Sequence, residues 1–343
     1  MISKVSISNY KSIQNLEIPL ANVNVFIGEN GSGKSNILEA IGMACAAQNN
    51  QLTTEDLFYR GIRVAKPALT FSSFLEKKQS KEIEISLIGK EEYKSKLFVE
   101  NEEDIFSVWK NKNNNIPKDQ DFYFNFLIFN LNSNVLRGFI IESQKKPLGI
   151  YGEGLDILLS TFSKEQIEEI KSYNFINWLE DFVISDNLQF AGYKLGRSLS
   201  KLYFTDKYMQ KKNNLFSAEN ANEGALFILF YLALFISEKT PAFFAIDNIE
   251  TALNPHLGRE LMYAITQLAV KYNKQVLITT HNPAILDGLN LFDENQKLFI
   301  VKRKDNGQTV AEELKAKPQI KEGKYKLSEL WMRGFIGGLP KDF

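Results

Sequence analysis

The sequence has 343 residues, 44% of them hydrophobic, with 41 basic and 41 acidic side chains. This length suits one large α/β domain with an inserted lobe, or two modest domains. Because the formal net charge is zero, overall charge gives no argument for nucleic-acid or membrane binding. The single cysteine, Cys45, excludes a disulfide framework within one chain and suits a buried apolar position.

The longest apolar run covers residues 225–236. It is too short to cross a bilayer and predicts a buried helix instead. The first residues lead directly into a strand-like pattern, with no sign of a signal peptide. We therefore expect a protein of the reducing cytoplasm with no membrane partner.

The chain begins with alternating apolar and polar side chains over residues 1–20. This alternation predicts two antiparallel strands joined near residues 9–12. A buried strand is predicted at residues 23–27, because all of them except Asn24 are apolar and mostly β-branched or aromatic. A helix is expected from residue 36 to about residue 45, with apolar side chains on one side.

Between this strand and this helix stands the pattern Gly28-x-x-x-x-Gly33-Lys34-Ser35. It is the phosphate-binding loop in its expected strand–loop–helix setting. Its glycines let the backbone come close to an anion, so that the N–H groups of residues 31–34 converge on a β-phosphate. Lys34 reaches the β- and γ-phosphate oxygens, and Ser35 offers its hydroxyl to Mg²⁺. The sequence therefore predicts a nucleotide site here.

Residues 67–130 change to β patterning. Apolar and polar residues alternate at residues 82–88 and 93–99, and a dense aromatic run covers residues 122–129. We interpret this region as an antiparallel β lobe, and the aromatic run as a strand buried on both faces.

Apolar residues at helical spacing between residues 155 and 190 predict a small helical lobe. Strand-like pieces follow at residues 195–204. We interpret the whole chain, residues 1–343, as one ATPase domain with four parts. Residues 1–66 and 216–300 form the nucleotide-binding core, residues 67–135 the β lobe, residues 136–215 the helical lobe, and residues 301–343 a C-terminal docking segment.

A second half of the site is predicted near the carboxyl ends of two later strands. Residues 242–246 are an apolar strand pattern that ends in Asp247, whose carboxylate would hold Mg²⁺, usually through water. After a helix expected at residues 256–272, the strand at residues 275–280 ends in His281. Since ligands bind at the carboxyl edge of such sheets, we interpret His281 as a sensor of the γ-phosphate.

The segment Asn222-Glu223-Gly224 precedes the long apolar helix, and it has two interpretations. Asn222 can cap that helix, with Glu223 in the first turn. Alternatively, this helix terminus binds the phosphate of an ATP molecule held by another subunit. The residues alone leave both interpretations open.

Taken in chain order, these segments resemble the ABC-type ATPases of the structural-maintenance-of-chromosomes (SMC), RecF and overcoming-lysogenization-defect (OLD) kind, loosely called AAA-type. The matching motifs are Asn9 to Ser12, Gly28 to Asn36, Asn222 to Gly224, Ile246 to Glu250 and Thr280 to Pro283. Three further segments are similar to stand-alone bacterial members, many of them carried by anti-phage defence modules. These are Leu136 to Gly138, Pro147 to Leu155 and Leu330 to Pro340.

The resemblance implies ATP and Mg²⁺ as ligands and a homodimer in which two subunits meet head to tail. ATP would lie between the phosphate loop of one subunit and the segment Asn222 to Gly224 of the other. The implied catalytic residues are Asn248, Glu250 and His281, and the implied metal ligands are Ser35 and Asp247. The implied nucleotide-binding residues are Lys11, Ser12, Gly28, Asn30, Gly31, Ser32, Gly33, Lys34, Ser35, Asn36, Asn222, Glu223 and Gly224.

Two positions depart from the family pattern. Asn248 stands where the family usually has the glutamate that polarises the attacking water. An amide is a poor base, so hydrolysis is expected to be slow unless Glu250 substitutes for the missing carboxylate. Asn222 stands where serine is commoner, which keeps a hydrogen-bonding group but changes its reach.

The leading hypothesis is an ATP-driven dimerisation switch that controls a separately encoded effector or DNA, in anti-phage defence or DNA maintenance. Asn248 favours the alternative, an ATP-sensing scaffold that barely hydrolyses ATP and holds an effector. A GTPase fits less well because no Asn-Lys-x-Asp motif follows the strands. A kinase would not need the segment Asn222 to Gly224 or His281, and that segment is far from the transporter form. For the apolar C-terminal segment, residues 331–340, docking on the core is favoured over an exposed partner-binding patch.

Overall fold

The computed structural model describes residues 1–63, 66–75, 80–99, 108–113, 125–139, 148–188, 199–315 and 325–339. At its centre is a six-stranded sheet in the order β14-β13-β3-β12-β11-β7. Neighbouring strands are parallel except β13 and β14, so the sheet is mixed, as predicted. Its strands are β3 (Val23–Ile27), β7 (Ile128–Phe129), β11 (Phe243–Ile246), β12 (Gln275–Thr279), β13 (Gln296–Arg303) and β14 (Thr309–Glu313).

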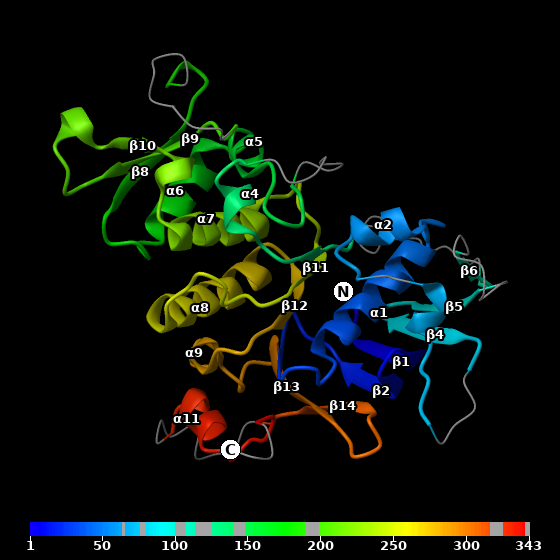
Figure 1. Ribbon diagram of the computed structural model, residues 1–343. Helices are drawn as coiled ribbons and strands as arrows, with labels where there is room; N and C mark the ends of the chain where they lie inside the picture. Colours follow the sequence, from blue (N-terminus) through cyan, green and yellow to red (C-terminus); the bar gives the residue numbers. More distant parts are fainter. Residues whose placement is uncertain are drawn as a thin grey trace.

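Helices cover both faces of the central sheet. Helices α7 (Glu223–Ile236), α8 (Pro255–Lys271) and α9 (Pro283–Leu286) lie on one face, and α1 (Lys34–Ala47) lies on the other (Figure 1). Strand β3 shows the reason, because Val25 packs into the core beneath α7 and α8 while Phe26 packs into the core around α1. A strand that is apolar on both sides needs cover on both faces.

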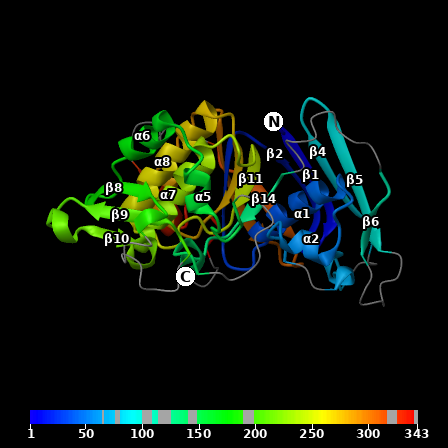
Figure 2. The same cartoon turned by 90° about the horizontal axis from the view of Figure 1, so that it is seen from above.

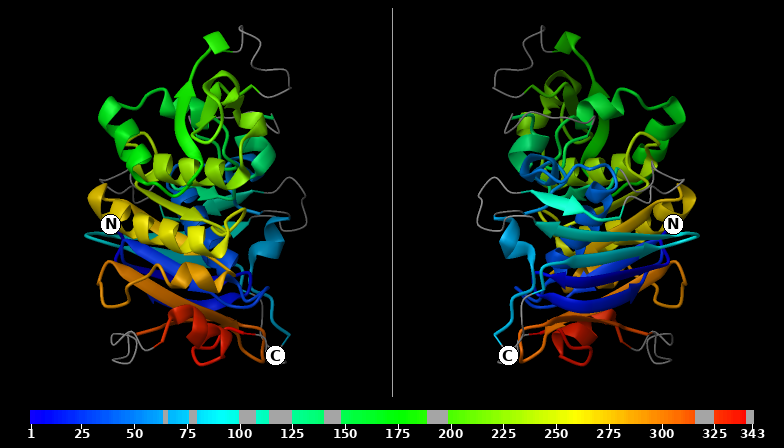
Figure 3. Two further views of the ribbon diagram at one scale, coloured as in Figure 1. Left: turned by 90° about the vertical axis from the view of Figure 1, so that its left-hand side faces the viewer. Right: turned by 90° about the vertical axis from the view of Figure 1, so that its right-hand side faces the viewer.

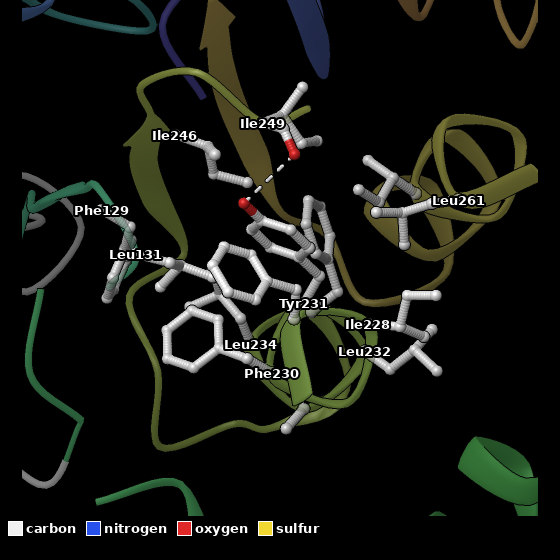
Figure 4. Packing of buried hydrophobic residues seen from close by; sticks show 14 of the residues in the cluster. Phe129, Leu131, Ile228, Phe230, Tyr231, Leu232, Leu234, Ile246, Ile249 and Leu261 are labelled. Atoms are coloured by element: carbon white, nitrogen blue, oxygen red, sulfur yellow. Dashed lines mark hydrogen bonds between the residues drawn. The ribbon is translucent and has the colours of Figure 1, made fainter. Parts of the chain in front are cut away.

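Helix α7 is buried along nearly its whole length. Every residue from Gly224 to Ile236 is buried. Tyr231 lies on the side of α7 that faces β11, and its hydroxyl donates a 3.4 Å hydrogen bond to the Ile249 carbonyl (Figure 4). The helix is therefore fixed to the loop that follows β11.

A second, antiparallel sheet has the strand order β2-β1-β4-β5-β6 and lies beside α1 (Figure 2). Antiparallel strands are present at the alternating segments, as predicted. Strand β1, expected in the nucleotide-binding core, pairs with β4 of the predicted β lobe, because the apolar sides of both strands pack on α1. The strands are β1 (Lys4–Tyr10), β2 (Ile13–Pro19), β4 (Ile83–Ile88), β5 (Glu92–Val99) and β6 (Trp109–Asn111).

The predicted helical lobe contains helices α5 (Leu155–Leu159) and α6 (Lys164–Ser172), and also a three-stranded antiparallel sheet in the order β10-β9-β8. The helix expected through residue 190 is wrong at β8 (Leu179–Ile184), which pairs with β9 (Leu202–Asp206). Strand β10 is Leu215–Ser217. Residues 189–198 of this expectation lie outside the described residues.

The aromatic run forms less strand than expected. Residues 122–124 lie outside the described residues, and of residues 125–129 only β7 is a strand. The remaining helices are short. They are α2 (Thr54–Phe58), α4 (Ser133–Leu136) and α11 (Leu327–Met332), with 3₁₀ turns at Pro67–Thr70, Lys211–Asn213 and Ala218–Asn220.

The C-terminal part does more than dock on the core. Strands β13 and β14 carry residues of the expected docking segment into the central sheet. Helix α11 then packs through Trp331, which is 3% exposed, into the core that also contains α7 and α8. It lies at the end of the molecule opposite the helical lobe (Figure 3). In the described part of the chain, no helix is both apolar enough and long enough to span a bilayer.

Candidate nucleotide site

The phosphate loop joins β3 to α1 through glycines in left-handed backbone conformations. Gly28 has φ 151° and Gly33 has φ 106°. A Cβ on Gly28 would lie 2.0 Å from the Val301 carbonyl oxygen, and one on Gly33 would lie 2.2 Å from Thr309 Oγ1. Only glycine fits at both positions, because strands β13 and β14 pack directly against the loop.

The tip of the loop is open. A Cβ on Gly31, whose φ is 75°, would meet no atom within 4 Å. Asn30 is exposed, while the Ser32 hydroxyl is buried and has no hydrogen-bond partner among the described residues. An open glycine backbone beside an unpaired buried hydroxyl fits the binding of a phosphate group.

Lys34 begins α1 and is 6% exposed. Its Nζ donates hydrogen bonds of 2.8 and 3.0 Å to the carbonyls of Gly28 and Glu29. Burial lowers the pKa of Lys34 to about 8, and the carboxylates of Asp247 and Glu250 partly oppose this shift. The ammonium is therefore held at the loop by neutral carbonyls, which a phosphate would replace with a stronger, charged partner.

Ser35 and Asp247 lie together, as the predicted metal pair. Ser35 Oγ is 3.1 Å from Asp247 Oδ2. No group of three His, Cys, Asp or Glu that could hold a metal occurs in the described ranges. Ser35 and Asp247 would therefore hold Mg²⁺ together with phosphate and water oxygens, which is the usual coordination of this ion. There Mg²⁺ would neutralise phosphate charge.

Thr279 is a site residue that the sequence analysis missed. It ends β12, where its hydroxyl donates to Asp247 Oδ1 at 2.5 Å and accepts from the Asn248 N–H at 2.9 Å. The parallel register pairs Ile246 with Ile278, so the residues that follow them are neighbours. Had the pairing of these two strands been known, the sequence would have placed Thr279 beside Asp247.

A cavity of about 390 Å³ adjoins the metal pair. Its wall includes Ser35 and Asp247 from the core, Arg63 after α2, and Asn130 and Tyr151 beyond β7. Asn130 was not predicted as a site residue. Its amide lies at the carboxyl end of β7, the strand paired in parallel with β11.

Two of the implied catalytic residues, Glu250 and His281, are in direct contact. The Glu250 Oε1 accepts a 2.8 Å hydrogen bond from the backbone N–H of His281, and Oε2 is buried with no partner among the described residues. Partial burial and the charge of Lys34 lower the pKa of His281, while Glu250 and Asp247 oppose the shift. The structure thus brings Lys34, Asp247, Glu250 and His281 within electrostatic reach of one another.

Asn248 directly follows Asp247 and has φ 58°. Asparagine tolerates this left-handed conformation better than most residues. Its backbone is bonded to Thr279, so the position is fixed while the side chain is an amide. Asp247 belongs to the metal pair. The next carboxylate along the chain after β11 is that of Glu250.

Ser12 is bonded to both Asn36 and Thr309, the first residue of β14. Asn36 Nδ2 donates to Ser12 Oγ at 2.7 Å, and Ser12 Oγ shares a 2.7 Å hydrogen bond with Thr309 Oγ1. Thr309 Oγ1 also donates to the Ser32 carbonyl at 2.8 Å. These side chains support the loop, and Thr309, which no sequence pattern indicates, connects them.

Lys11 forms an ion pair with Glu39. Its Nζ lies 2.6 Å from Glu39 Oε2, and Arg63 Nε lies 2.6 Å from Glu39 Oε1. Glu39 is 2% exposed, and a buried carboxylate needs such partners. In this structure Lys11 forms an ion pair within the protein, and the contact with the nucleotide that the resemblance implies stays a prediction.

Asn222 occupies the N-cap position of α7, but its side chain makes no capping hydrogen bond. Of the two interpretations, capping is borne out in the position of Asn222 but not in a side-chain hydrogen bond, and the exposed amide is available to a ligand. A Cβ on Gly224 would lie 3.3 Å from the Ala252 carbonyl. The N-terminus of α7, with Glu223 in its first turn, thus lies against the loop that follows Asp247.

Comparison with known proteins assigns the chain to a family. Residues 1–308 match the family model described as RecF/RecN/SMC N terminal domain. The chain belongs to this family. It is an ABC-type ATPase of the SMC/RecF kind, and ATP and Mg²⁺ are the ligands such proteins use in general.

Solved structures of SMC heads have the same fold. The SMC head bound to the C-winged helix domain of ScpA is 16% identical and has a TM-score of 0.61, with 93% of this chain and 99% of that chain covered. The SMC head domain from Thermotoga maritima is 13% identical with a TM-score of 0.54, covering 92% and 99%. At these identities the likeness shows the fold alone, and it confirms the predicted P-loop α/β class.

Curated relatives match only a short part of this SMC/RecF-type chain. The DNA replication and repair protein RecF of Listeria welshimeri is 36% identical over 58 residues, which are 17% of this chain and 16% of that protein. RecF of Clostridium botulinum is 43% identical over 56 residues, 16% and 15% of the two chains. The match thus spans about one sixth of the length of these relatives.

Proposed function

We propose that this protein is a slow ATPase that uses Mg·ATP to join two copies head to tail, as a switch for a partner. Gly28 to Ser35 would hold the triphosphate, and Ser35 and Asp247 the Mg²⁺. The segment Asn222 to Gly224 of a second copy would complete the site. The γ-phosphate then supplies the difference in affinity between the open and closed states that a switch requires.

The observation that carries this proposal is the uncapped N-terminus of α7. A 14-residue helix has unpaired N–H groups and partial positive charge at this end. Most N-cap asparagines satisfy such a group, yet Asn222 is exposed and makes no side-chain bond to the helix. A phosphate brought by a second copy would satisfy both the helix terminus and the amide.

The test is to mix two inactive variants. Lys34→Ala disables the phosphate loop, and Asn222→Ala disables the proposed trans contact. In a head-to-tail dimer of the two, the intact loop of one subunit meets the intact segment of the other, so ATP turnover returns in the mixture. If the mixture stays as inactive as either variant alone, while both remain folded, the trans site is absent.

A second candidate is an ATP-sensing scaffold with very little hydrolysis. It is favoured by Asn248, because the amide cannot act as a general base. Substitution Asn248→Glu distinguishes the candidates. If hydrolysis is limited by the missing carboxylate, this variant turns over ATP about a hundredfold faster than wild type. If wild type already hydrolyses ATP and Glu250→Gln abolishes turnover, Glu250 is the base.

The partner is either DNA or a separately encoded protein. RecF relatives are named for DNA replication and repair, and an SMC head relative was solved with a domain of ScpA. A role in anti-phage defence rests on the resemblance to stand-alone bacterial members. Turnover measured with and without duplex DNA, and with the product of a neighbouring gene, identifies which partner responds.

A further inference from the structure

The C-terminal segment reaches back to the phosphate loop. After α11 come Gly334, Gly337 and Gly338, whose φ values are 76°, 78° and 81°. A Cβ on Gly338 would lie 3.4 Å from Gly28 Cα and 3.2 Å from Ile300 Cγ2. Two glycine backbones therefore meet here, one at the start of the phosphate loop and one near the end of the described chain.

The indole of Trp331 points into the same junction. The position that a Gly338 Cβ would occupy lies 3.5 Å from Trp331 Nε1. Trp331 is 3% exposed, and its N–H has no hydrogen-bond partner among the described residues. A buried N–H is usually paired, and one that is unpaired needs an explanation.

Lys34 supplies the explanation. In this structure its Nζ satisfies the carbonyls of Gly28 and Glu29. A bound triphosphate attracts the same ammonium, so these carbonyls lose their donor. An unsatisfied carbonyl at the buried end of the loop is costly, and the unpaired indole N–H points into the junction where Gly28 and Gly338 meet.

We propose that Trp331 and Gly338 are positioning residues of the nucleotide site. The segment from Trp331 to Gly338, here called the C-terminal strap, holds the Gly28 end of the loop. When phosphate draws Lys34 away, the Trp331 N–H donates to a loop carbonyl that Lys34 has released. This inference rests on the proposed ATP binding, and it concerns a segment outside the family match, which ends at residue 308.

The first experiment compares two glycine substitutions with equal backbone cost. Gly334→Ala and Gly338→Ala both place a side chain at a left-handed φ, but a Cβ on Gly334 would meet no atom within 4 Å. Equilibrium dialysis of Mg·ATP should give a dissociation constant about tenfold higher for Gly338→Ala and little changed for Gly334→Ala. Equal values for both variants and wild type would overturn the role of the strap.

The second experiment measures the fluorescence of the Trp331 indole. Wild-type tryptophan fluorescence should change when Mg·ATP is added. Trp331→Phe, which keeps an aromatic ring but has no N–H, should lose this change and bind Mg·ATP more weakly. Trp178→Phe, in the helical lobe, should keep it. A nucleotide response that is undiminished in Trp331→Phe would contradict the proposal.

Lys34→Ala separates this inference from the function beneath it. If Lys34→Ala abolishes Mg·ATP binding while the strap variants bind like wild type, the site stands and the strap role fails. If wild type itself does not bind Mg·ATP, the proposed function fails first.

Discussion

Lys34 is a lysine whose charge depends on its surroundings. Burial lowers its pKa to about 8 in the free protein, so above that pH the ammonium is increasingly lost. Between this pKa and the ordinary value of 10.5, Lys34 carries its proton in the unfolded chain but largely not in the folded one. The contribution of Lys34 to the free energy of unfolding therefore rises with pH across that window.

Phosphate binding needs the charged form and raises this pKa again. We therefore predict that Mg·ATP binding at about pH 9 takes up close to one proton, and that its affinity falls by up to about tenfold per pH unit above pH 8. Titration calorimetry in two buffers of different ionisation enthalpy measures the uptake. At about pH 7 Lys34 is already protonated, and no uptake should remain.

Lys274 offers a matched control for this prediction. Its pKa is also lowered to about 8 by burial, but its Nζ donates to the carbonyls of Ser237 and Thr240, away from the loop. Lys274→Met should leave the proton uptake unchanged. If the proton uptake disappears in Lys274→Met but persists in Lys34→Arg, the titrating group lies outside the site.

At the scale of elements, strand β14 supports the phosphate loop through one hydroxyl. Thr309 is 1% exposed and joins Ser12 to the Ser32 carbonyl. We predict that Thr309→Val lowers the free energy of unfolding by about 1–3 kcal/mol, because it leaves buried polar groups unpaired. It should also weaken Mg·ATP binding. Urea unfolding and equilibrium dialysis measure the two effects.

Thr266→Val is the control for this substitution. Thr266 is also buried, at 3% exposed, but its hydroxyl donates to the Tyr263 carbonyl within α8. It should cost some stability and leave nucleotide affinity unchanged. If both variants bind Mg·ATP like wild type, β14 contacts the loop but does not affect nucleotide binding.

The elements that were predicted well are those with local signals. Residues 23–47 carry an apolar strand, glycines and a helix within one stretch, and they fold as β3, the loop and α1. Strand β8 was missed because Ile176, Leu179 and Phe182 are spaced like one side of a helix. The pairing of β8 with β9 decides its structure, and that pairing joins segments that no short-range pattern connects.

The same limit applies to the candidate site. Asp247 and His281 could be predicted because each ends an apolar strand. Thr309 and Trp331 could not, because their contacts with the loop depend on how β14 and α11 return to it. Asn222 was placed correctly at the helix terminus, yet only the structure shows that its side chain leaves the cap unmade.

At the scale of the whole molecule, the two phosphate-binding surfaces should respond differently to protein concentration. We predict that Mg·ATP protects amides of residues 28–35 from hydrogen exchange at any concentration. Protection of amides at the N-terminus of α7 should appear only where two copies associate. Hydrogen-exchange mass spectrometry at low and high protein concentration measures both.

The N-terminus of α6 is the control for that experiment. Ser163 caps it through a complete capping box with Gln166, so the amides of these two residues are already paired, and this helix end should not respond to Mg·ATP. Protection of the α7 terminus that is independent of concentration would mean that the contact is made within one copy.

The central position of β3 has a consequence for how the protein is made. Its two neighbours, β12 and β13, come from the last third of the chain, so a ribosome has released most of the polypeptide before either exists. Until then an apolar strand has both edges unsatisfied, a situation that favours aggregation. We expect nascent chains to need shielding by a chaperone until β12 and β13 have been made, and messages cut short before β12 to yield insoluble product.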